Sequence, residues 1–134
     1  MTLGHPGDLM RPGRELDTLI ARNVFNHDVI IKRKIPTEVT PAGERPLREY
    51  CKEMGAAFDV LKALNISLIP IEGNQWFALA GKRDGFTSPA DFLKYLSAGD
   101  FQSAGAAVAE SAPQAICLAA LNALESAKNK ELMN

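Results

Sequence analysis

The sequence has few of the residues on which metal sites and disulfide frameworks depend. Its 134 residues include only two cysteines and two histidines. A zinc site needs three or four ligands brought together, and neither His5 nor His27 has a Cys or His partner at ligand spacing, so the sequence predicts no bound metal. Cys51 and Cys117 both lie within helical patterns of apolar residues. This placement predicts buried, reduced thiols rather than reactive ones.

An excess of charge and long apolar runs are also missing. The chain has 15 Lys and Arg against 16 Asp and Glu, a net charge of −1. Coating nucleic acid requires many more cations than anions, so we expect no DNA or RNA duplex as partner, although local basic patches remain allowed. No stretch reaches the roughly 18 apolar residues of a membrane span, and residues 1–13 lack the apolar core of a signal peptide. We therefore expect a soluble, intracellular protein with no membrane partner.

The length fits one domain. A chain of this size can bury about two thirds of its unfolded surface without disulfides or metal. Its first residues are rich in Gly and Pro, which sustain neither a helix nor a central strand. The sequence thus predicts a flexible arm over residues 1–13 and a single domain over residues 14–134.

Hydrophobic periodicity predicts four helices in this domain. Apolar residues recur three or four positions apart in residues 14–25, 47–64, 89–96 and 111–128. Ser88 and Ser111 have the pattern of helix caps, and Asn65 suits a left-handed stop after the second helix. The alanine-rich stretch that begins near Ser103 indicates backbones packed close together.

Strands are predicted at residues 29–35, 66–71, 75–81 and 106–110. Glu72, Gly73 and Asn74 have the composition of a tight hairpin turn, and Pro70 indicates an edge strand. The prolines of residues 36–46 predict a loop of about ten residues. This order of elements predicts an α/β fold, namely a single small three-layer α/β/α sandwich with a mixed sheet of three to four strands.

Three segments, residues 14–21, 50–58 and 110–121, resemble the phage ABA sandwich domain family, which comprises small proteins of bacteriophages and prophages. The resemblance implies a phage origin and a sandwich fold. It covers helix caps and core faces rather than a chemical motif, so it implies no activity. Two features depart from the family: Cys51 and Lys52 stand where it usually has Ser and Thr, and residues 85–101 form a longer connection.

Catalytic motifs are also missing. No nucleophile elbow surrounds Ser67, Ser88 or Ser111. No glycine-rich phosphate loop follows a strand, and most acids lie next to a compensating base. The sequence therefore predicts a protein that is not an enzyme and has no cofactor.

Basic residues nevertheless gather in three places along the chain. If the strand at residues 29–35 neighbours the hairpin at 66–81, these groups surround the predicted loop at 36–46. Arginine grips phosphate, helix N-termini favour anions, and aromatic rings stack on bases. The predicted ligand-binding residues are Lys32, Lys34, Arg45, Arg48, Tyr50, Trp76, Lys82 and Arg83.

These observations lead to one principal hypothesis about function. We expect a non-enzymatic phage accessory protein that binds and sequesters a small anionic, nucleotide-like ligand, such as a host anti-phage immune signal, in the cytoplasm of the infected bacterium. Two alternatives stay open. One is a protein-interaction or assembly module that uses the last helix or Phe86 and Phe92, and the other is a small hydrolase of a nucleotide signal. A homo-oligomer is also expected, because small residues on the last helix allow close approach between subunits.

Overall fold

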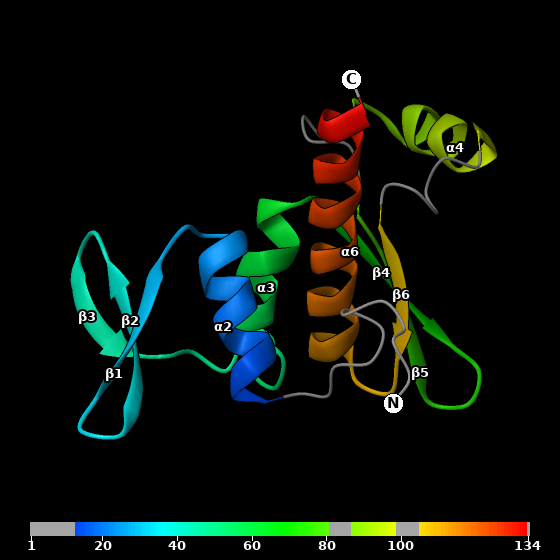
Figure 1. The fold of residues 1–134 in the computed structure, drawn as a ribbon. Coiled ribbons are helices and arrows are strands. Elements are labelled where there is room, and N and C mark those ends of the chain that lie inside the picture. Colours follow the sequence, from blue (N-terminus) through cyan, green and yellow to red (C-terminus); the bar gives the residue numbers. More distant parts are fainter. Residues whose placement is uncertain (1–12, 81–86, 99–104, 134) are drawn as a thin grey trace, which may run out of the picture.

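The computed structural model describes residues 13–80, 87–98 and 105–133, and Figure 1 shows its helices and strands. The helices are α2 (Arg14–Asn23), α3 (Met54–Ala63), α4 (Pro89–Ala98) and α6 (Ala112–Met133). The strands are β1 (Asp28–Lys32), β2 (Ile35–Thr40), β3 (Gly43–Pro46), β4 (Ile66–Ile71), β5 (Gln75–Ala80) and β6 (Ala106–Ala109). The protein has an α/β sandwich fold, as the sequence predicts. The predicted arm lies outside the described residues except for Gly13.

The strands form two antiparallel sheets, with orders β1-β2-β3 and β4-β5-β6, in place of one mixed sheet. Helices α2, α3 and α6 lie between the two sheets (Figure 1). Helix α6 packs on β5 and β6, and α2 packs on α6 and β1. Tight turns join β1 to β2, β2 to β3 and β4 to β5, and such turns allow only antiparallel neighbours. Because β1 belongs to one sheet and the β4–β5 hairpin to the other, the prediction that they are neighbours is wrong.

The loop predicted at residues 36–46 is also wrong, because this stretch forms β2 and β3. Each proline takes a place where its missing N–H costs little. The carbonyl of Pro36 accepts a hydrogen bond from the Leu47 N–H at 3.0 Å, so its nitrogen faces the side on which β3 has already ended. Pro41 lies in the two-residue turn, and Pro46 ends an edge strand. Prolines are compatible with strands at such positions.

The central helix begins at Met54, not at residue 47 as predicted. A helix from residue 47 would need the Cys51 N–H to bond the Leu47 carbonyl. Instead, the Leu47 carbonyl accepts from Arg14 Nη1 at 2.9 Å, and the Cys51 N–H donates to Asp17 Oδ1 at 3.1 Å. Side chains of α2 thus replace the first helical bond and hold this segment open.

The strand predicted at residues 29–35 instead ends at Lys32, and the chain turns through Arg33 and Lys34. The predictions for the second hairpin and for the helix ends are confirmed. The hairpin of β4 and β5 turns through Gly73 and Asn74, both with positive φ, and β4 is an edge strand. Ser111 Oγ accepts from the Gln114 N–H at 3.3 Å, and Ser88 Oγ accepts from the Asp91 N–H at 3.1 Å. Asn65 has φ 52° after α3. In the predicted 85–101 elaboration, residues 89–98 form α4 and Ser88 caps it, whereas residues 85–86 and 99–101 lie outside the described residues.

Cys51 and Cys117 are fully buried and free, which confirms them as structural thiols. Burial, helped by a hydrogen bond to Asp17, raises the pKa of Cys51 to about 12. Burial likewise raises the pKa of Cys117 far above its ordinary value.

We expect neither thiol to react with Ellman's reagent at pH 8 while the protein is folded, because the reactive thiolate is suppressed at both sites. Both should react at once in concentrated urea. Measuring the released chromophore before and after unfolding tests this expectation. Rapid labelling of one thiol per chain in buffer would contradict the buried position of Cys51 or Cys117.

Candidate functional site

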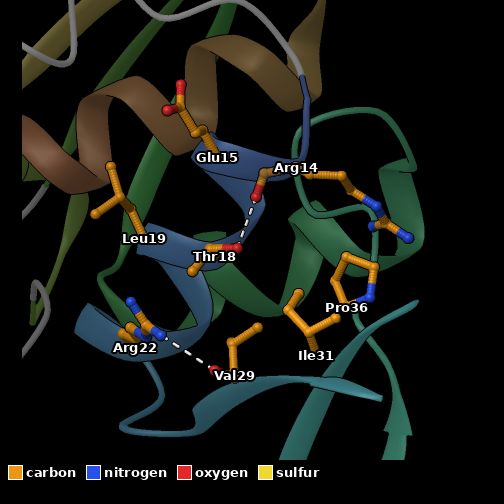
Figure 2. A pocket seen from close by; sticks show the side chains of 8 residues that line it. All are labelled: Arg14, Glu15, Thr18, Leu19, Arg22, Val29, Ile31 and Pro36. Carbon is orange, nitrogen blue, oxygen red and sulfur yellow. Dashed lines mark hydrogen bonds between the residues drawn. The ribbon is translucent and has the colours of Figure 1, made fainter. Parts of the chain in front are cut away.

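One face of the first sheet contributes to two neighbouring features, an open cleft and a buried polar cluster. Val29 pairs with Glu38 and Ile31 pairs with Pro36 in the β1–β2 ladder. Paired residues, and residues two apart on one strand, project from the same face of a sheet. Arg45 pairs with Glu38 in the β2–β3 ladder and so projects from this face too. We call it the inner face, because Val29, Ile31 and Pro36 line the cleft with α2 (Figure 2).

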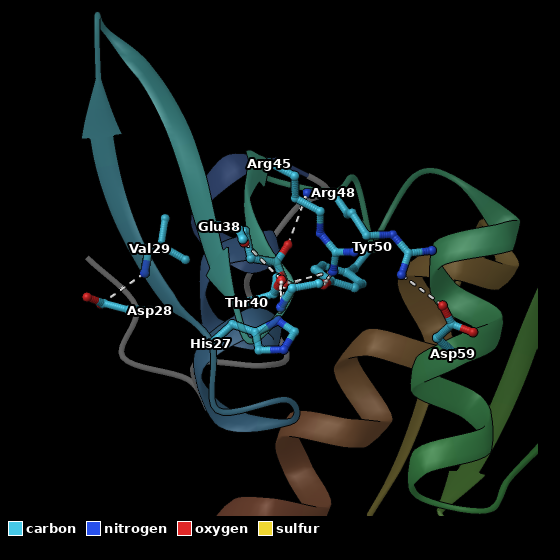
Figure 3. A network of polar contacts seen from close by, with 11 residues as sticks. His27, Asp28, Val29, Glu38, Thr40, Arg45, Arg48, Tyr50 and Asp59 are labelled. Carbon is cyan, nitrogen blue, oxygen red and sulfur yellow. Dashed lines mark hydrogen bonds and ion pairs between the residues drawn. The ribbon is translucent and has the colours of Figure 1, made fainter.

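The polar cluster is built around the carboxylate of Glu38, which is fully buried. Its Oε2 accepts a hydrogen bond from the Tyr50 hydroxyl at 2.6 Å and lies 2.5 Å from His27 Nδ1 (Figure 3). Arg45 Nη2 lies 3.3 Å from the same oxygen. The Arg48 N–H donates to Oε1 at 3.4 Å. Donors from four residues therefore surround a single anion.

Protonation in this cluster follows from the contacts. Burial alone would raise the pKa of Glu38, but hydrogen bonds from His27, Tyr50, Arg45 and the Arg48 N–H together hold it below its usual 4.5. Burial and the neighbouring Glu38 carboxylate raise the pKa of Tyr50 well above its ordinary value. At neutral pH, Glu38 is therefore an anion and Tyr50 is a proton donor to it.

The Tyr50 side chain is fully buried, so neither face of its ring is exposed for a base to stack on. The Phe25 ring stacks on it at 5.4 Å, and the Arg48 guanidinium lies 5.4 Å from its centre. Arg48 Nη1 also forms an ion pair with Asp59 Oδ2 at 2.8 Å. The protein's own carboxylates thus neutralise both arginines that the sequence places at this point, Arg45 and Arg48.

The residues predicted from the sequence are only partly brought together. Arg45, Arg48 and Tyr50 share the cluster, whereas Lys32 forms an ion pair with Glu44 and Lys34 lies in the β1–β2 turn. Trp76 belongs to β5 in the other sheet, where it packs half-buried against the core. Lys82 and Arg83 lie outside the described residues. The role of all eight as ligand contacts stays a prediction.

Sequence reasoning missed Glu38, His27 and Asp59. Glu38 lies in the run Thr37-Glu38-Val39-Thr40, and the β-branched residues around it are typical of a strand. This pattern indicates a strand, but the flanking Pro36 and Pro41 favour a loop and led to the wrong prediction. His27 lies between α2 and β1, where its ring stacks on that of Phe25 at 5.9 Å.

The cleft lies between α2 and β1 and has a volume of about 480 Å³. Arg14, Thr18 and Arg22 are spaced four residues apart on α2 and form one wall, so the two arginines lie about 12 Å apart along the helix axis. The apolar side chains of Val29, Ile31 and Pro36 form the opposite wall (Figure 2). The cleft is thus mostly apolar, with a guanidinium at each end of its helical wall.

Both arginines are oriented by the protein and still keep donors for a ligand. Arg14 Nη1 donates to the Leu47 carbonyl at 2.9 Å and lies 3.4 Å from Asp17 Oδ2. Arg22 Nη2 donates to the Val29 carbonyl at 3.1 Å and forms no ion pair with any described residue. A guanidinium has five N–H donors in a fixed fork. Arg22 therefore offers a charge that no described acid neutralises.

The described residues include neither a metal-binding cluster nor a membrane-spanning helix. None of their His, Cys, Asp or Glu side chains gather into a group of three or more that would hold a metal ion. None of the described helices combines the length and apolar character needed to cross a membrane.

Comparison with known proteins gives a likeness in fold. No protein-family model matches the chain, and no curated protein matches it. A 2.0 Å crystal structure of a phage protein from Bacillus cereus ATCC 14579 is similar, with a TM-score of 0.56 and 18% sequence identity. The match covers 92% of this chain and 96% of that one. At this identity the likeness concerns the fold.

Proposed function

We propose that this chain is a non-enzymatic phage protein, related to the phage ABA sandwich domain family, that binds a small anionic, nucleotide-like ligand in the cleft between α2 and β1. The observation that carries the proposal is the cleft itself, which combines an apolar sheet wall with two oriented arginines. The similar phage protein fold supports the phage origin.

The cleft suits a ligand with a flat apolar body and separated negative groups. Its volume of about 480 Å³ lies in the range of small-molecule sites. A base or sugar would lie against Val29, Ile31 and Pro36, while phosphate groups meet Arg14 and Arg22. Arginine suits this role because its fork binds two phosphate oxygens at once.

The Glu38 cluster supports the proposal as a framework for the cleft. Val29 and Glu38 are cross-strand partners, so fixing Glu38 also fixes the strand that carries the apolar wall. We propose that Arg45, Arg48 and Tyr50 orient this sheet rather than contact the ligand. Lys32 projects from the opposite face of the sheet, where it pairs with Glu44, and Lys34 lies in the β1–β2 turn, so we propose neither as a ligand contact.

Sequestration rather than turnover is the proposed outcome of binding. The cleft lining includes one carboxylate, Glu15, and one hydroxyl, Thr18. The Thr18 hydroxyl donates to the Arg14 carbonyl at 2.7 Å, so its proton is already engaged in the helix. A nucleophile needs a general base within hydrogen-bonding reach. The proposed role is to hold a host immune signal intact within the infected bacterium.

The proposal is tested by calorimetric titration with cyclic dinucleotides, cyclic trinucleotides and ADP-ribose. We expect at least one to bind with Kd below about 10 µM, or roughly 7 kcal/mol, and to be recovered intact after the protein is denatured. Arg22→Glu should weaken binding about 10- to 100-fold, the effect of losing a charge-assisted hydrogen bond.

Lys52→Glu is the matched control, since it reverses an exposed charge outside the cleft lining. It should bind as the wild type does. Weak binding of all three ligand classes would exclude the proposal, as would equal losses in the Arg22 and Lys52 variants. Recovery of a cleaved ligand would replace sequestration by hydrolysis.

A further inference from the structure

The turn between β1 and β2 is made of two residues that its backbone does not favour. Arg33 has φ 51° and Lys34 has φ 67°, both in the left-handed region. Two-residue hairpin turns with positive φ at both positions prefer Asn-Gly or Asp-Gly, because side chains with a Cβ are strained there. The other described non-glycine residues with positive φ are Asn26, Asn65 and Asn74. Every other described non-glycine position with positive φ is thus occupied by asparagine, and only this turn has larger, charged residues there.

No described contact explains the two cations. Arg33 and Lys34 are exposed, and neither forms a hydrogen bond or ion pair with a described residue. The flanking apolar side chains are also exposed, Ile31 by 68% and Ile35 by 52%. Backbone strain retained without an internal benefit is typical of functional positions. We call residues 31–35, with the sequence Ile-Lys-Arg-Lys-Ile, the hairpin tip.

We propose that the hairpin tip docks into a groove of duplex DNA. A two-stranded ribbon fits the major groove, where cations on its turn reach the phosphates and apolar side chains contact base edges. The first sheet lies at the side of the molecule away from the second sheet, so a duplex can approach it (Figure 1). A narrow tip suits a concave groove better than a flat bilayer. The net charge of −1, which predicts no duplex partner, averages over the whole chain and does not describe this tip.

This inference is independent of the proposed small ligand, because it rests on different residues and a different surface. Ile31 alone belongs to both, since it also borders the cleft. The double variant Arg33→Asn with Lys34→Gly separates the two, since it keeps Ile31 and gives the turn the residues that its backbone prefers. We expect it to raise the melting temperature and to weaken DNA binding at least tenfold. A merely structural turn would show the first change without the second.

The binding experiment measures fluorescence anisotropy of a labelled 20-base-pair duplex with the full chain. If three phosphates are neutralised, wild-type affinity should fall about 40-fold between 50 and 200 mM salt, whereas one remaining contact gives about 3.5-fold. Lys52→Gln with Lys62→Gln removes the same charge from exposed positions on another part of the chain. This control should retain the wild-type affinity and salt dependence.

Four results would overturn the proposal. The first is that the duplex shows no saturable binding at 50 mM salt, and the second is that the tip and control variants lose the same amount of DNA affinity. The third is that the tip variant keeps the wild-type affinity. The fourth is that the protein binds vesicles with 30% anionic lipid more tightly than DNA. The Arg22→Glu variant should bind DNA normally, so failure of the ligand cleft and failure of the hairpin tip are distinguishable.

Discussion

Replacing Glu38 by Gln is expected to lower the free energy of unfolding by about 3–5 kcal/mol, the usual effect of removing one partner from a buried charged network. The Tyr50 hydroxyl, His27 Nδ1 and Arg45 all converge on one carboxylate oxygen. An amide NH₂ in this place would face those donors with its own hydrogens and leave Arg45 without its anion. Urea unfolding followed by circular dichroism measures the loss, as a lower midpoint with an unchanged m-value.

Glu44→Gln is the matched control on the same sheet. Glu44 is exposed, and its carboxylate pairs with the exposed Lys32 ammonium. Exposed ion pairs contribute little, so this variant should change stability by less than about 1 kcal/mol. A loss below 1 kcal/mol in Glu38→Gln, or equal losses in the two variants, would contradict the role assigned to the cluster.

The same pair of proteins gives a pH signature. Hydrogen bonds hold the native pKa of Glu38 below its usual 4.5, so the unfolded chain takes up a proton first as the pH falls. The stabilisation by Glu38 is therefore complete above about pH 4.5 and is lost as the pH falls through the native pKa. This part of the acid-induced loss should be absent in Glu38→Gln. The difference in unfolding free energy between wild type and variant should shrink in that window.

Local patterns predicted those parts of the fold that local interactions determine. The Ser88 and Ser111 caps and the Gly73-Asn74 turn each depend on neighbours within a few residues, and each is present. Residues 47–53 behave differently. Their apolar spacing favours a helix, but Arg14 and Asp17, more than 30 residues away in sequence, take the bonds that would start it. A pattern read over a short stretch of sequence does not include such distant hydrogen-bond partners.

The site was predictable only in part for a related reason. Arg45, Arg48 and Tyr50 do converge, as their positions in the sequence suggested. The sequence did not reveal that Glu38 and Asp59 would neutralise the arginines. The members of each pair lie in different segments, 7 residues apart in sequence for Glu38 and Arg45 and 11 for Arg48 and Asp59, and only the fold brings them together. The cleft was missed because its helical wall has an ordinary amphipathic pattern. Arg14, Thr18 and Arg22 become a site only when β1 lies opposite them.

Replacing Gly105 by Ala is expected to lower the free energy of unfolding by about 3–5 kcal/mol, from overpacking together with strain at a glycine-only backbone angle. Gly105 has φ +128°, and a Cβ there would lie 2.6 Å from the backbone nitrogen and Cβ of Ala123 in α6. Backbone cannot move aside as a flexible side chain can. The alanine-rich composition predicted backbones in close contact, and this is the place where β6 begins against α6. Thermal unfolding should show a much lower melting temperature.

Gly55→Ala provides the control for the chemistry of the substitution. Gly55 lies in the first turn of α3, where an added Cβ would meet no atom within 4 Å. Alanine is the better helix former, so this variant should gain about 0.5–1 kcal/mol. The same change from Gly to Ala should therefore have opposite signs at the two positions. A Gly105→Ala protein as stable as the wild type would contradict the close backbone contact between Gly105 and Ala123 at the start of β6.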